Sequence, residues 1–175
     1  MFDPAVLAAA GIGIAILLAI LMHVMEPPRR IARGDGALVH VMAGDDSVRT
    51  ARAIARVLDD GFRVETHPRA DARPILVAFG RAAGKAFKPA ENKPARALVL
   101  IDPQIKTMAP ADTLFPPVVI LAPEHKRVAA LKAALPRAEL IAAPAFARSP
   151  QKQRLQLIAQ AVRRAARMAE DAGEG

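Results

Sequence analysis

Six short apolar runs, separated by helix-forming stretches, constrain the fold of this chain more than any other feature. The runs are rich in Val, Ile and Leu, and several are apolar at consecutive positions. Strands of this kind are buried on both faces, which is typical of a parallel sheet covered by helices. The runs span residues 37–42, 62–66, 75–79, 97–101, 118–122 and 139–143.

Amphipathic stretches between the runs predict the helices. Ser47 is placed to cap the first helix and Gly61 to end it. The alternation predicts an α/β fold: a three-layer α/β/α domain over residues 37–170, with a mostly parallel sheet of about six strands, followed by a flexible tail over 171–175. The expected helices span residues 48–60, 82–87, 127–135 and 151–170.

Residues 5–22 form an uninterrupted apolar run of 18 residues near the N-terminus. About 20 apolar residues span a bilayer as a helix. We therefore expect a transmembrane anchor over 1–26 and a linker rich in Pro, Gly and Arg over 27–36. A cleaved signal peptide is the alternative, but the N-terminus Met-Phe-Asp-Pro lacks the basic residues that such a peptide needs.

Basic residues flank the apolar run on one side. Arg29, Arg30 and Arg33 follow it, and no Lys or Arg precedes it. The positive-inside rule then places the N-terminus outside and the remaining chain in the cytoplasm. The sequence therefore predicts a single-pass protein of the bacterial inner membrane.

Two features of the anchor suggest contacts within the membrane. Gly11, Ala15 and Ala19 share one helix face, where small residues allow a second helix to pack closely; the alternative is that Ala is simply abundant in this chain. The spacing Ala19-x-x-x-His23 resembles the pigment-ligating pattern of bacterial light-harvesting polypeptides. The alternative for His23 is an interfacial side chain among lipid headgroups.

Composition excludes several chemistries. The chain has no Cys, which excludes disulfides and thiol catalysis, and its only serines are Ser47 and Ser149. The formal net charge is +8, and one face of the last expected helix carries several arginines. This basic surface is either solvated arginine or a site for anionic lipid or an acidic partner. No pattern indicates nucleic-acid binding.

Residues 75–84 predict a strand that enters a glycine turn and then a helix of small residues. Gly80-Arg81-Ala82-Ala83-Gly84 resembles the G-x-S-x-G nucleophile elbow of the α/β-hydrolase superfamily, with Ala82 in the serine position. Gly80 and Gly84 would then let the strand and the helix pack closely.

The resemblance extends in order over most of residues 37–170. It implies that Lys126 matches the family's catalytic acid and Arg148 its catalytic histidine. A hydrolytic triad needs an oxygen nucleophile, an imidazole base and an orienting carboxylate. Ala82, Lys126 and Arg148 supply none of these, so the resemblance implies a truncated, catalytically degenerate member that is not an enzyme.

The competing interpretation is an active or ligand-binding site formed by residues other than the triad positions. Asp45, Asp46 and Asp102 follow strands at the edge where open α/β sheets bind ligands, and carboxylates are Mg²⁺ ligands. His125 beside Glu124 is a further candidate ligand or acid–base group. Alternatively the paired aspartates favour a helix N-terminus, Asp102 closes a turn and His125 is a surface residue. We expect no metal and no cofactor.

Taken together, the sequence predicts a non-catalytic accessory, scaffolding or assembly subunit of a larger inner-membrane complex, for example a photosynthetic or respiratory one. The partners would be an integral-membrane complex and possible anionic lipid headgroups. The alternative is a membrane-anchored hydrolase-like enzyme, or a small-ligand sensor, with relocated site residues.

Overall fold

The computed structural model describes residues 14, 17, 36–59, 61–66, 72–86, 95–105, 116–135 and 137–173. Most of the expected anchor and linker lies outside these residues. No helix within them combines the length and the apolar character needed to cross a membrane. Also outside them are the expected packing, ligand and flanking positions Gly11, Ala15, Ala19, His23, Arg29, Arg30 and Arg33.

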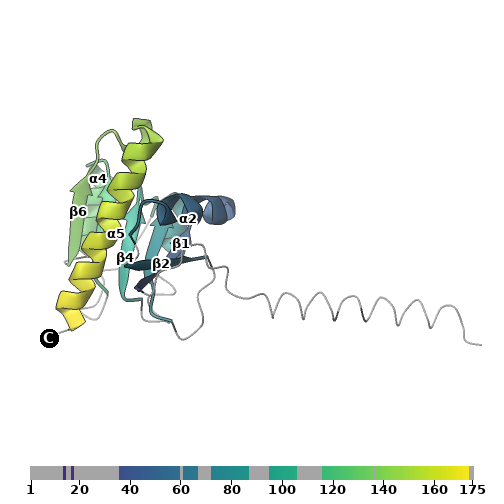
Figure 1. Ribbon diagram of the computed structural model, residues 1–175. Helices are drawn as coiled ribbons and strands as arrows, with labels where there is room; N and C mark the ends of the chain where they lie inside the picture. The colour runs from purple at the N-terminus through teal and green to yellow at the C-terminus, as the bar shows by residue number, and fades with distance from the viewer. Residues whose placement is uncertain are drawn as a thin grey trace, which may run out of the picture.

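The core of the domain is a sheet of six parallel strands, as the apolar runs predict (Figure 1). The strand order is β2-β1-β3-β4-β5-β6, and each neighbouring pair is parallel. The order reverses between β1 and β3, which is the switch point of a doubly wound sheet. The strands are β1 (Ala37–Met42), β2 (Phe62–Glu65), β3 (Ile75–Phe79), β4 (Ala97–Ile101), β5 (Val118–Ala122) and β6 (Ala138–Ala142).

Helices cover both faces of the sheet. Helices α2 (Ser47–Ala55) and α5 (Gln151–Gly173) pack on one face, and α4 (Lys126–Ala134) packs on the other (Figure 1). Helix α5 lies mainly over β4 and β5 and also contacts α2. Short 3-10 turns follow three strands: η1 (Gly44–Asp46), η2 (Gly80–Ala82) and η3 (Phe146–Arg148).

Burial on two faces explains why the middle strands lack alternation. All residues of β4 and β5 are buried. Val99 belongs to the hydrophobic cluster under α2 and α5, whereas its neighbours Leu98 and Leu100 belong to the cluster under α4. Successive side chains of a strand point to opposite faces, so each face needs its own apolar residues.

Several element ends differ from the sequence predictions. Helix α2 ends at Ala55 rather than at 60, because the carbonyl of Ile54 accepts from the amides of both Val57 and Leu58 and the chain leaves the helix in a turn. Ser47 is the first residue of α2, and its hydroxyl bridges Ala43 and Gly44 instead of capping that helix. Helix α5 continues through the start of the expected tail to Gly173, because no helix breaker precedes that glycine.

The start of β1 lies directly against the turn before β2. The amide of Ala37 donates to the carbonyl of Gly61 at 2.9 Å. A Cβ added at Gly36 would overlap that same carbonyl group. Only glycine at position 36 allows this approach without a backbone shift.

We predict that Gly36→Ala lowers the free energy of unfolding by about 1–3 kcal/mol through this overlap. Gly84→Ala is the matched control: a Cβ there meets no atom within 4 Å. Because Gly84 lies in a helical turn over residues 83–86, alanine there should be neutral or stabilising by about 0.5–1 kcal/mol. Urea titration of the full-length protein in mild detergent measures the free energy of unfolding of each variant. Equal stability of the two variants would contradict the close approach.

Candidate functional site

The three positions that match the hydrolase triad all follow strands at the carboxyl edge of the sheet. Ala82 ends η2 after β3, Lys126 begins α4 after β5, and Arg148 ends η3 after β6. Lys126 and Arg148 are exposed. Neighbouring strands lie about 4.8 Å apart, so the ends of β3 and β5, with β4 between them, are about 10 Å apart. An alanine, a lysine and an arginine supply no oxygen nucleophile, no imidazole and no carboxylate.

The turn after β3 differs from a strained elbow. Its positive φ of 49° belongs to Gly80, and the sole non-glycine residue with positive φ among the described residues is Asp102. The position that matches the nucleophile, Ala82, is therefore not strained. Gly84 is exposed and has open space where a side chain would lie. Gly80 likewise has no atom within 4 Å of a Cβ position, so the expectation that Gly80 and Gly84 permit close packing of strand and helix was wrong; Gly80 serves the positive φ of the turn instead.

The candidate ligands Asp45, Asp102 and His125 occupy the same edge but follow different strands. Asp45 is exposed in η1 after β1, Asp102 is half-buried after β4, and His125 precedes α4. Within the described ranges, no group of three His, Asp or Glu residues is placed to hold a metal ion. Strand spacing accounts for this, because β3 separates β1 from β4.

His125 has a structural role in this arrangement. It is the N-cap of α4, and its Nδ1 accepts a hydrogen bond from the amide of Val128 at 3.3 Å. A cap of this kind satisfies one of the amides that an α-helix leaves without an internal partner.

A capping role predicts different outcomes for two substitutions. We expect His125→Ala to lower the free energy of unfolding by about 0.5–2 kcal/mol, and His125→Asp to retain wild-type stability because Asp is a preferred N-cap. Chemical denaturation measures both values. Wild-type stability of the alanine variant would show that the cap contributes nothing.

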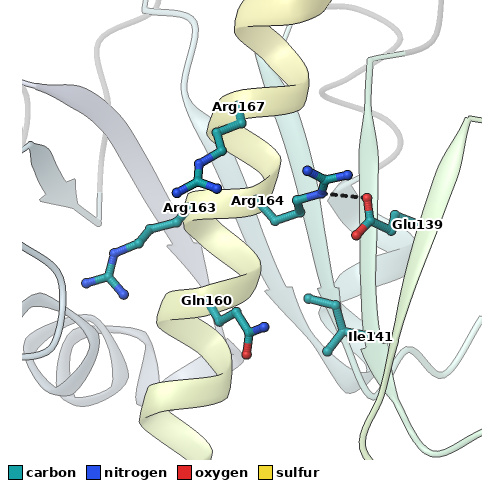
Figure 2. A pocket seen from close by; sticks show the side chains of 6 residues that line it. All are labelled: Glu139, Ile141, Gln160, Arg163, Arg164 and Arg167. Atoms are coloured by element: carbon teal, nitrogen blue, oxygen red, sulfur yellow. Dashed lines mark hydrogen bonds and ion pairs between the residues drawn. The ribbon is translucent and has the colours of Figure 1, made fainter.

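A groove of about 220 Å³ lies between α5 and β6, outside the carboxyl edge (Figure 2). Because α5 covers β4 and β5, the edge strand β6 is flanked by this helix and not covered by it. Figure 2 shows the Arg164 side chain extending from α5 toward Glu139 on β6, with Ile141 farther along the strand. The lining residues are Glu139, Ile141, Gln160, Arg163, Arg164 and Arg167.

Two of the three arginines hold the helix in place. Arg164 donates from Nε to Oε2 of Glu139 at 2.7 Å and joins α5 to β6. Arg163 donates from Nε to Oδ2 of Asp59 at 3.2 Å, and a further bond to the carbonyl of Val57 joins α5 to the segment after α2. Arg167 makes no ion pair with any residue that the structure describes.

The groove therefore has an excess of positive charge. Its six lining residues include three arginines and one glutamate. Arg167 lies four residues after Arg163 and three after Arg164, and like charges at these helical spacings repel. The side chains of Arg164 and Glu139 are 47% and 37% exposed, so water screens their pair and its contribution to stability is at most about 1 kcal/mol.

An anionic group in this groove would balance the unpaired charge. Arginine provides a planar fork of donors that matches carboxylates and phosphates, but it cannot serve as a base. The arrangement is suited to binding rather than to catalysis. Ile141 adds an apolar surface beside the charged wall.

Sequence reasoning identified the arginines of this helix but not the groove. Gln160, Arg163, Arg164 and Arg167 follow the spacing i, i+3, i+4 and i+7, which marks one helix face. The contribution of Glu139 and Ile141 was missed, because it depends on β6 being the edge strand. Parallel strands give no sequence signal for their order in the sheet.

Comparison of the chain with protein-family models, with curated proteins and with solved structures gives no match. The resemblance to the α/β-hydrolase superfamily therefore stays a prediction. The α/β fold itself rests on the six-stranded sheet.

Proposed function

We propose that this chain is a non-catalytic binding subunit whose α/β domain docks on an acidic surface of a larger inner-membrane complex. An N-terminal transmembrane helix anchors it, with the N-terminus outside and the domain in the cytoplasm. Its role is that of an accessory, scaffolding or assembly subunit, and photosynthetic and respiratory complexes are examples of suitable partners.

The observation that carries the proposal is the arginine-lined groove between α5 and β6. Arg167 contributes a cation that no described carboxylate neutralises. Charge complementarity steers association between proteins and selects partners of opposite sign. An acidic protein surface is therefore the partner that this groove fits.

The non-catalytic part of the proposal is supported by the carboxyl edge. Ala82, Lys126 and Arg148 lack triad chemistry, and His125 is engaged as a helix cap. The alternative enzyme or sensor needs Asp45, Asp102 and His125 to converge on one ligand. These residues follow β1, β4 and β5, which favours docking over that alternative.

Restoring a hydroxyl should not restore hydrolysis. We expect Ala82→Ser in the full-length protein to give no turnover of p-nitrophenyl acetate above that of the unsubstituted chain. The two described histidines are engaged elsewhere: Nδ1 of His40 lies 3.3 Å from the carbonyl of Glu65, and His125 caps α4. Neither is then available to take the serine proton. Steady-state absorbance measures the rate. Saturable turnover that appears with the serine and disappears on its modification by a fluorophosphonate would contradict the proposal.

Docking should depend on the charge of the groove. We expect the full-length protein to co-purify with a membrane complex in mild detergent, and Arg167→Glu to reduce its recovery by about tenfold or more. The substitution should not unfold α5. It makes Arg163 and Arg164 opposite-charge neighbours and Glu170 and Asp171 like-charge ones, and these effects, about 0.2–0.5 kcal/mol per pair, offset each other. Native gels with mass spectrometry of the complex measure recovery.

Arg127→Glu is the matched control for this experiment. Arg127 is exposed in the first turn of α4, on the opposite face of the sheet, and an acidic residue is also favourable there. We expect this variant to be recovered like the wild type. Migration of the wild-type protein as a free monomer, or equal loss in both variants, would contradict docking through the groove.

A further inference from the structure

Strand β6 is an edge strand with little protection. It pairs with β5 on one side, and no described strand pairs with its other side. An unpaired edge presents free amides and carbonyls to other chains, and proteins usually protect such edges with lysine, proline, bulges or short strands. The sequence Ala-Glu-Leu-Ile-Ala contains no lysine or proline, and its one charge, Glu139, is paired with Arg164.

The other edge of the sheet is better protected. Strand β2 has four residues and carries both Arg63 and Glu65, whose side chains form an ion pair at 3.2 Å. A short, charged strand is a poor template for pairing. The two edges are therefore unequal, and the less protected one adjoins the arginine groove.

The groove and the edge together fit one kind of ligand. Glu139 and Ile141 alternate with Leu140 along β6, and they line the groove on the α5 side. Leu140 packs with the cluster under α4, on the opposite face. A strand paired with β6 would project every second side chain toward α5, where Arg167 and its neighbours lie.

We propose that β6 accepts an extended acidic segment of the partner protein as a seventh strand, with alternate carboxylates of that segment directed at the arginines of the groove. This proposal rests on the docking function proposed above and specifies how docking occurs. Backbone hydrogen bonds to β6 supply affinity, and the arginines select acidic side chains, as in other strand-addition complexes.

A second copy of this chain fits the edge less well. Two copies paired through β6 about a two-fold axis would place both α5 helices on the same face of the joined sheet. The two arginine grooves would then adjoin each other, each with an excess of positive charge. Like charges across an interface oppose association, so an acidic partner is favoured over self-pairing.

Labelled peptides of alternating valine and glutamate test the proposal on the full-length protein in nanodiscs of neutral phosphatidylcholine. Fluorescence anisotropy gives the dissociation constant. Two further peptides carry backbone N-methyl groups, one on all valines and one on all glutamates, which removes amide donors without changing charge. In a strand, the backbone amides of alternate residues point to the same neighbouring strand, so either all valine amides or all glutamate amides point to β6. The peptide methylated on the residues whose amides point to β6 should bind at least about tenfold more weakly than the other methylated peptide.

The protein variants provide the second arm. Arg167→Glu should raise the dissociation constant of the unmodified peptide by at least about tenfold, and Arg127→Glu should leave it unchanged. Equal binding of all three peptides would overturn strand addition while leaving charge-based docking intact, which the co-purification experiment tests separately. Displacement of the peptide by an equimolar amount of glycerophosphoserine, the soluble headgroup of phosphatidylserine, would assign the groove to lipid headgroups and overturn the proposal.

Discussion

Burial of the middle strands on both faces is the constraint on which the rest of the structure depends. Strands β3, β4 and β5 can leave water only if helices cover both sides. Helices α2 and α4 lie in connections between parallel strands, and α5 follows the last strand. The long α5 is centred over β4 and β5, where the most apolar surface lies. That placement leaves β6 at the margin, flanked on one side by a basic helix face. The groove thus forms because α5 covers β4 and β5 and leaves β6 beside it.

Much of the fold was predictable because its signal is local. Apolar runs gave the position of each strand within a residue or two, as for β6, which lies at Ala138–Ala142 instead of 139–143. The end of α2 was less predictable, because the turn after Ala55 is set by bonds to the carbonyl of Ile54. Sheet order was not predictable, since every strand carries a similar apolar pattern.

The residues of the candidate site were likewise predictable from the sequence only in part. The arginines of α5 were evident from helical spacing, whereas Glu139 and Ile141 join them only through tertiary packing. His125 shows the opposite case: its residue type suggested chemistry, and its bond to the amide of Val128 shows a cap. Residue type therefore identifies candidates, but what a side chain contacts decides its role.

The junction at Gly36 also has a mechanical consequence. Strand β1 begins at Ala37, whose amide is bonded to Gly61, and it pairs with β2 on one side and β3 on the other. A pull on the chain before Gly36 along the strand axis loads both hydrogen-bond ladders in shear, so their bonds must break together rather than one at a time. Tension applied from the N-terminal side of the domain thus acts on a strand that is held on both sides, which is suited to the membrane anchor that we propose for this chain.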